Sequence, residues 1–86
     1  MRNSTMFYVY VLRCNDGTLY TGYTIDVIER VKNHNKGTAS KYTRSRRPVK
    51  LVAKWQYATK SAALKAEAAF KRLSRNEKIR MLAINV

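Results

Sequence analysis

The order of apolar and polar positions predicts a β-hairpin near the start of the chain. In residues 6–13, aromatic and aliphatic side chains alternate between two faces, so that Val9 and Tyr10 belong to opposite faces. The NDG segment at residues 15–17 is typical of a tight turn. Residues 18–24 are rich in Thr and Tyr, which favour a returning strand.

A helix and a basic loop follow the hairpin. The helix is expected to begin after Asp26, which can accept hydrogen bonds from its first turn, while Glu29 completes a capping box. Gly37 is a plausible stop, because glycine tolerates the left-handed conformation in which many helices end. Residues 38–48 are predicted to be a loop.

The remaining chain predicts a strand and two helices. Residues 49–57 alternate, with one buried face formed by the odd positions: Val49, Leu51, Ala53, Trp55 and Tyr57. An alanine-rich helix is expected at residues 61–73 with Ser61 as its N-cap, and Ser74 and Glu77 form a capping box for a last helix. The order is β-β-α-β-α-α, in one domain at residues 6–83 after a flexible polar lead-in at residues 1–5.

The charge of the chain predicts a polyanionic partner. Eighteen Lys and Arg against five Asp and Glu give a formal net charge of +13, and no acidic residue lies between Arg30 and Ala66. A field of this sign attracts nucleic acid. An anionic membrane is disfavoured, because the basic residues do not fall on one long amphipathic helix. The lone cysteine, Cys14, excludes an intramolecular disulfide and fits the reducing cytoplasm.

The length of the hairpin loop decides how its tyrosines are placed. In a two-residue loop Tyr10 pairs with Tyr23, and Tyr20 lies on the opposite face. In a three-residue loop Tyr10 lies opposite Gly22 and shares a face with Tyr20. We favour the second register, because Gly17 supplies the left-handed residue that such a loop requires. Gly22 would then leave open space in front of Tyr10, unless it serves only in packing.

One acidic residue lacks a local structural role. The other four belong to the turn and the capping boxes: Asp16, Asp26, Glu29 and Glu77. Glu67 shares a helical stripe with Ala63 and Phe70, which points it toward the protein body. It can form an ion pair, with Lys71 or across the fold, or it can bind a hard divalent cation together with water and a substrate phosphate.

Arg30 and His34 are four residues apart and therefore lie on one face of the first helix. The planar guanidinium of Arg30 can contact a phosphate with two parallel hydrogen bonds. His34 can transfer a proton near neutral pH, or it can be an ordinary surface histidine.

Taken together, these residues resemble the GIY-YIG nuclease domain, and most closely its small stand-alone bacterial members. The features that carry the resemblance over residues 6–80 are YVY at 8–10, YTG at 20–22, Arg30, His34 and Glu67. The two name motifs are degenerate, so the resemblance depends on their combination with the later residues.

The resemblance implies an α+β fold with a three-stranded antiparallel sheet flanked by helices. It also implies an endonuclease that hydrolyses DNA phosphodiester bonds with one divalent ion, Mg²⁺ or Mn²⁺. By analogy Tyr10 and Tyr20 line the site, Arg30 holds the scissile phosphate, Glu67 binds the metal and His34 assists proton transfer. Asn76 is a further candidate, although it lies closer to Glu67 in sequence than the family pattern suggests.

The basic loop is expected to hold the DNA backbone beside this site. Its candidate contacts are Lys41, Arg44, Arg46, Arg47 and Lys50. Tyr42 can stack on an unpaired base or pack on the loop. The competing hypotheses are a module of the same fold that binds DNA or RNA without cutting it, and a basic RNA-associated protein without any site. Because the sequence offers no separate module for reading DNA sequence, we expect structure preference, weak selectivity or a protein partner for targeting.

Overall fold

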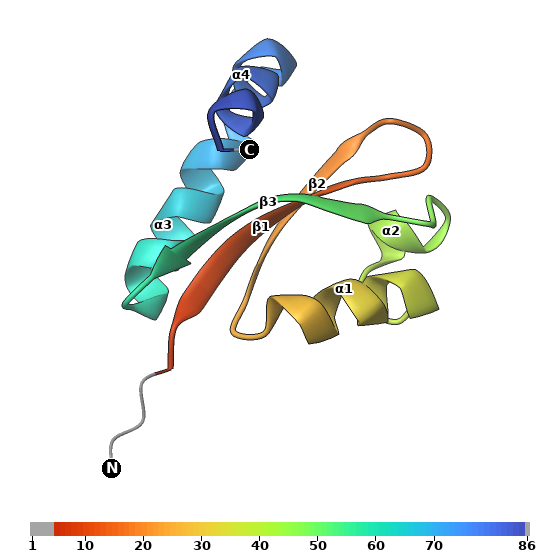
Figure 1. The fold of residues 1–86 in the computed structure, drawn as a ribbon, viewed down its shortest axis with the longest axis horizontal. Coiled ribbons are helices and arrows are strands. Elements are labelled where there is room, and N and C mark those ends of the chain that lie inside the picture. Colours follow the sequence, from red (N-terminus) through yellow and green to blue (C-terminus); the bar gives the residue numbers. More distant parts are fainter. Residues whose placement is uncertain (1–4, 86) are drawn as a thin grey trace.

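The computed structural model describes residues 5–85 and consists of a small sheet with helices on both faces (Figure 1). The elements in chain order are β1 (Phe7–Arg13), β2 (Leu19–Thr24), α1 (Val27–Lys36), α2 (Lys41–Arg44), β3 (Lys50–Tyr57), α3 (Lys60–Lys71) and α4 (Arg75–Asn85). Except for Thr5, the expected lead-in lies outside the described residues. Within residues 5–85, none of the helices has the length and apolar character that crossing a bilayer requires.

The sheet has the order β2-β1-β3, and both strand pairs are antiparallel. This confirms the predicted α+β class and the β-β-α-β-α-α order. The short helix α2 is an addition to that order, in a segment predicted as a loop. It forms because Ser40 caps it, accepting a hydrogen bond from the Tyr42 amide at 3.1 Å.

The β1–β2 hairpin has the three-residue register. The Cys14 amide donates to the Thr18 carbonyl at 2.8 Å, and Gly17 has a left-handed φ of 85°. Tyr10 consequently lies opposite Gly22, as expected. This register is the first condition for the candidate site, because it puts Tyr10 and Tyr20 on one face.

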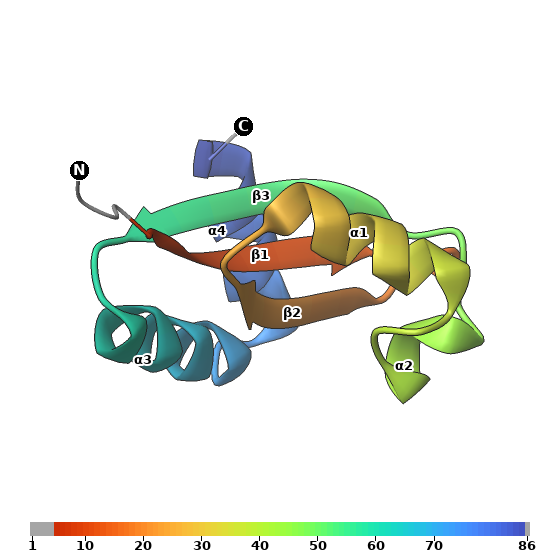
Figure 2. The same cartoon turned by 90° about the horizontal axis from the view of Figure 1, so that it is seen from below.

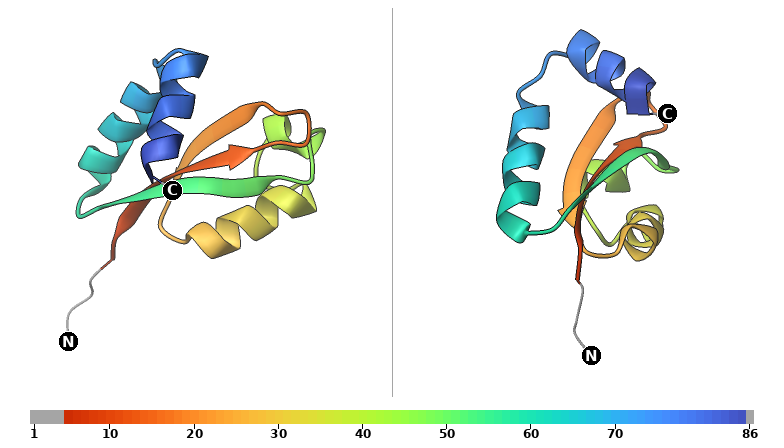
Figure 3. Two further views of the ribbon diagram at one scale, coloured as in Figure 1. Left: turned by 45° about the horizontal axis from the view of Figure 1, so that its top comes forward. Right: turned by 60° about the vertical axis from the view of Figure 1, so that its left-hand side comes forward.

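The two faces of the sheet carry separate cores, and different helices cover the two faces (Figures 2 and 3). On one face, Tyr10 and Leu12 pack with Val27 of α1. On the other, Val11 packs with Phe70 of α3. Figure 3 shows α1 and the α3–α4 pair on opposite sides of the sheet, and the alternation predicted for β1 is therefore confirmed.

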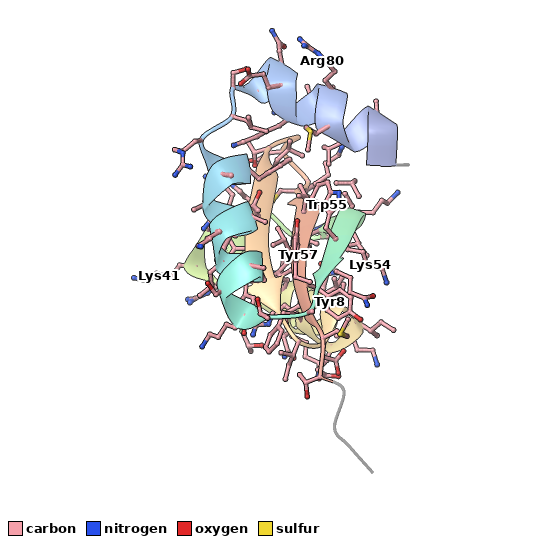
Figure 4. The ribbon with its side chains drawn as sticks, turned by 90° about the vertical axis from the view of Figure 1, so that its left-hand side faces the viewer. Tyr8, Lys41, Lys54, Trp55, Tyr57 and Arg80 are labelled. Atoms are coloured by element: carbon pink, nitrogen blue, oxygen red, sulfur yellow. The ribbon has the colours of Figure 1, made fainter. Side chains whose placement is uncertain are left out.

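The single-face prediction for the third strand is wrong, because β3 contains a bulge. Val11 pairs with Ala53 while Leu12 pairs with Leu51, so Val52 is an extra residue in the ladder. Val49 therefore belongs to the Tyr10 core, whereas Ala53 belongs to the Phe70 core together with Trp55. Figure 4 shows Trp55 and Tyr57 on the side of β3 that faces α3, where both line an apolar hollow of about 400 Å³.

Two of the predicted helix caps differ in the structure. Helix α3 begins at Lys60 and is capped by Thr59, whose hydroxyl accepts from the Ala62 amide at 3.1 Å, so Ser61 is not the N-cap. At α1, Asp26 accepts from the Glu29 amide at 3.0 Å, as expected. Its own amide, however, donates to the Thr24 hydroxyl at 3.1 Å and not to Glu29.

The predicted capping box of the last helix is confirmed. The Glu77 amide donates to the Ser74 hydroxyl at 3.2 Å, and the Ser74 amide donates to the Glu77 carboxylate at 2.9 Å.

Candidate active site

Tyr10 is at the centre of the candidate site. It lies in the middle strand and is 1% exposed. Its ring crosses over the edge strand β2 at Gly22, where an added Cβ would lie 2.5 Å from the phenol oxygen. The space in front of Gly22 is therefore filled by Tyr10 itself. Glycine is required here for close approach, and this position is not an open pocket.

His34 connects helix α1 to Tyr10. Its Nε2 atom lies 2.8 Å from the Tyr10 hydroxyl, and its Nδ1 atom lies 2.8 Å from the hydroxyl of Thr43 in α2. The side chain is completely buried, which overturns the interpretation of His34 as a surface residue. Burial of a histidine between two hydroxyls holds the ring in one orientation.

The Tyr10 phenol is influenced by groups from three other segments, β2, α1 and α3. Burial is the main cause that raises its pKa above the usual range, and Tyr20 and the Glu67 carboxylate raise it further. The Arg30 guanidinium opposes them, through its charge and through a hydrogen bond. At neutral pH Tyr10 is therefore a phenol and not a phenolate.

His34 is held in its neutral form. Burial lowers its pKa, and the charge of Arg30, one turn earlier on α1, lowers it further. The neutral imidazole has one unprotonated ring nitrogen, so His34 is able to accept a proton.

Tyr20 extends the aromatic cluster toward the surface. Its ring lies edge-on to His34, with centroids 5.1 Å apart, and stacks on Tyr42 at 5.9 Å. The Arg46 guanidinium carbon lies 3.9 Å from the centre of the Tyr42 ring. Tyr42 therefore packs on neighbouring parts of the protein, which favours the loop-packing alternative over base stacking.

Glu67 lies where the helical stripe predicted it. Ala63 and Phe70 on the same stripe are buried, and the Glu67 side chain is 16% exposed. Its Oε2 atom pairs with Lys71 Nζ at 3.0 Å, so the ion-pair alternative is observed. Helix α3 packs against the edge strand β2 (Figure 2), which brings this carboxylate within electrostatic range of Tyr10.

A divalent cation is chemically compatible with this arrangement. Among residues 5–85, no group of three or more His, Cys, Asp or Glu side chains is placed to enclose a metal ion. Mg²⁺ commonly keeps several waters and uses one or two carboxylates plus a substrate phosphate. A single carboxylate fits that coordination, whereas it does not fit a closed structural metal site.

The basic residues proposed to hold DNA differ in whether the protein itself already engages their side chains. Lys41, Arg44 and Lys50 are exposed. Arg46 is tied to Asp16 at 3.0 Å and donates to the Tyr42 carbonyl at 2.8 Å. Arg47 donates to the Arg44 carbonyl at 2.7 Å.

Asn76 is separate from the Tyr10 cluster in the contacts of the described residues. It is exposed in the first turn of α4, a helix that packs against β3. Thr43, in contrast, belongs to the cluster and was missed by the sequence reasoning. A threonine within a basic segment gives no signal of its own, and only the burial of His34 reveals it.

The sequence has clear relatives. The family described as the GIY-YIG catalytic domain matches residues 6–80. A UPF0213 protein of Staphylococcus epidermidis is 52% identical over 75 residues, which are 87% of this chain and 92% of that protein. A UPF0213 protein of Pediococcus pentosaceus is 51% identical over 79 residues, which are 92% of this chain and 83% of that protein.

Two solution NMR structures share the fold. The UPF0213 protein of Bacillus halodurans is 46% identical, with a TM-score of 0.62 over 92% of this chain and 84% of that chain. A protein of E. faecalis is 42% identical, with a TM-score of 0.63 over 98% of this chain and 91% of that chain.

Proposed function

The chain belongs to the GIY-YIG catalytic domain family, a family of nuclease domains, and on that premise we propose that it is a metal-dependent endonuclease. It would hydrolyse DNA phosphodiester bonds with one Mg²⁺ or Mn²⁺ ion. The observation that carries the proposal is that His34, Arg30 and Glu67 all act on the Tyr10 phenol. His34 reaches the phenol oxygen by a hydrogen bond, while Arg30 and Glu67 act on it from helices on opposite faces of the sheet.

In the proposed reaction, a water molecule attacks the phosphorus in line while Tyr10 receives its proton. A phenolate is a poor candidate for this base, because burial raises the pKa of Tyr10. The phenol oxygen can instead accept the water proton while its own proton passes to Nε2 of His34, 2.8 Å away. The raised pKa of Tyr10 is therefore compatible with a relay through this residue.

Arg30 supports the reaction from α1. Its guanidinium acts on the Tyr10 oxygen, so a phosphate bound by Arg30 would lie beside the residue that activates the water. The positive charge would stabilise the transition state as negative charge grows on the phosphoryl oxygens. Tyr20, on the same face, would hydrogen-bond a phosphate oxygen or the water.

Glu67 would hold the metal ion. When bound, the ion would polarise a phosphate oxygen and stabilise the leaving oxygen. Lys71 pairs with one oxygen of this carboxylate and would release it to the ion, pairing instead with a phosphate.

DNA would be held mainly through its phosphates. The net charge of +13 and the exposed side chains of Lys41, Arg44 and Lys50 supply affinity. Such contacts carry no direct sequence information, so selectivity would come from DNA structure or from a protein partner.

The experiment compares cleavage of labelled single-stranded, duplex and branched DNA with Mg²⁺, with Mn²⁺ and with EDTA. The variant is Glu67→Gln, and the matched control is Glu29→Gln, which removes the same charge from an exposed position on α1. We expect Glu67→Gln to bind DNA and lose cleavage, and Glu29→Gln to keep both. Undiminished cleavage by Glu67→Gln would remove this residue from the mechanism.

One observation favours the non-cleaving alternative. Glu67 already has an ion-pair partner, so the carboxylate is accounted for without a metal. Tight, salt-dependent binding of DNA or RNA without cleavage under any metal condition would support a binding module.

A further inference from the structure

A series of three hydrogen bonds runs from Tyr10 to a backbone carbonyl, and the first two of them are buried. The Tyr10 hydroxyl meets His34 Nε2 at 2.8 Å, and His34 Nδ1 meets the Thr43 hydroxyl at 2.8 Å. The Thr43 hydroxyl continues to the Ser40 carbonyl at 3.3 Å. The side chains of Tyr10, His34 and Thr43 are at most 1% exposed, so each group must satisfy its hydrogen bonds within this chain.

The Ser40 carbonyl sets the donor-to-acceptor direction of all three hydrogen bonds. A carbonyl oxygen only accepts, so the Thr43 hydroxyl donates to Ser40. The Thr43 oxygen then receives the hydrogen of His34 Nδ1. In a neutral imidazole the other nitrogen, Nε2, carries no hydrogen, and it therefore accepts from the Tyr10 hydroxyl.

We infer that Thr43 is a positioning residue that fixes His34 in the Nδ1–H tautomer and thereby directs the Tyr10 hydroxyl to donate its proton to His34. The inference rests on the proposed nuclease function. With the Tyr10 hydrogen directed inward, the lone pairs of its oxygen face away from His34, and the Arg30 guanidinium acts on the same oxygen. The proposed reaction requires one of these lone pairs to receive the water proton.

The proton balance is complete within the named groups. An O–H bond of the attacking water breaks, and its proton joins the Tyr10 oxygen as the original phenol hydrogen moves to His34 Nε2. The hydroxide forms the new bond to phosphorus, the bond to the leaving oxygen breaks, and the leaving oxygen takes a proton from solvent. The imidazolium of His34 then returns its proton through Tyr10 to solvent.

The opposite tautomer would block this relay. A hydrogen on Nε2 would point at the Tyr10 oxygen, and the phenol hydrogen would then have to be directed outward. Thr43 would have to donate to Nδ1, and it would no longer donate to the Ser40 carbonyl. A hydrogen-bonded partner on the second ring nitrogen is the usual means by which proteins select a histidine tautomer.

The test uses the fact that His34 is the only histidine in the chain. In protein without a histidine tag, the ring ¹⁵N signals belong to this residue alone. We expect the Nδ1–H tautomer in the wild type and in Thr43→Ser, and a shift toward Nε2–H in Thr43→Val. Thr21→Val is the control, since Thr21 is also buried and pairs with Val11, on the opposite face from Tyr10.

Cleavage is measured on the same proteins. Thr43→Val should cut about 10²-fold more slowly, with unchanged DNA affinity in EDTA, and Thr43→Ser should recover most of the rate. If Thr43→Val fails to fold, the ring ¹⁵N signals of the wild type and of Thr43→Ser still show whether His34 is in the Nδ1–H tautomer. An Nε2–H tautomer in the wild type, or an unchanged tautomer and rate in Thr43→Val, would overturn the inference.

The two proposals fail separately. Absence of cleavage by the wild type would refute the nuclease function while the tautomer still reports whether Thr43 sets the ring. A wild-type Nε2–H tautomer would refute the role of Thr43 and leave cleavage unaffected.

Discussion

The Tyr10 phenol lies across the β1–β2 ladder from Gly22, so close that a Cβ at position 22 would be 2.5 Å from the phenol oxygen and 2.6 Å from the ring carbon that bears it. The ring is buried and held at its tip by His34, so it has little room to move. The glycine therefore sets where the hydroxyl lies.

Gly22→Ala should displace the Tyr10 ring and destabilise the protein by about 1–3 kcal/mol, because overpacking a filled site forces side chains from their preferred positions. Urea unfolding measures this loss, and cleavage should fall as the hydrogen bond to His34 is disturbed. The control is a double-mutant cycle with Tyr10→Leu, which removes the clashing atoms. Strictly additive effects on the free energy of unfolding would contradict this account.

Acid should destabilise the protein through His34. Burial lowers the pKa of His34 in the folded state, so below about pH 6.5 the unfolded chain binds more protons at this position than the native state does. The free energy of unfolding should consequently fall as pH decreases through this window. His34→Gln, which has no titrating ring, should lack that component, and the difference between the two unfolding curves isolates it from the carboxylates.

Lys71→Met should lower the Mg²⁺ concentration that gives half-maximal cleavage, because Lys71 competes for the Glu67 carboxylate. Lys65→Met is the matched control, since it removes the same charge from an exposed position on the same helix. A higher Mg²⁺ requirement in Lys71→Met than in Lys65→Met would show that Lys71 supports the ion.

Arg44→Gln should weaken DNA binding and reduce the slope of log affinity against log salt by about 0.9 if Arg44 contacts one phosphate of duplex DNA. The same change at Arg80, on α4, is the control for lost charge. Figure 4 shows Arg80 on α4 and Lys41 on the separate α2 segment. If both variants have the same slope of log affinity against log salt, the α2 segment is not a preferred site of DNA contact.

The sequence was sufficient for the hairpin register and for every element except the short helix α2. Local chemistry determines both, since Gly17 allows the three-residue loop and the capping residues mark helix ends. The bulge at Val52 was not predictable, because a one-residue insertion depends on pairing with β1 and leaves the composition of the strand unchanged.

The candidate residues could be named from the sequence, but their environment could not. His34 is buried because hydroxyls from residues 24 positions before it and nine positions after it satisfy both ring nitrogens. Such pairing depends on tertiary contacts that periodicity does not report. Thr43 was missed for the same reason, since its role exists only once α2 lies against α1.

The bulge in β3 has a consequence for unfolding. Because β3 and the residue that precedes it contribute Val49 to one core and Ala53 to the other, and β1 contributes to both, neither set of helices has a sheet of its own. Loss of α3 and α4 would expose the strands that also hold Tyr10 in place. The chain should therefore melt in a single transition, and damage to α3, which carries Glu67, should be transmitted to Tyr10 and His34 as a loss of order.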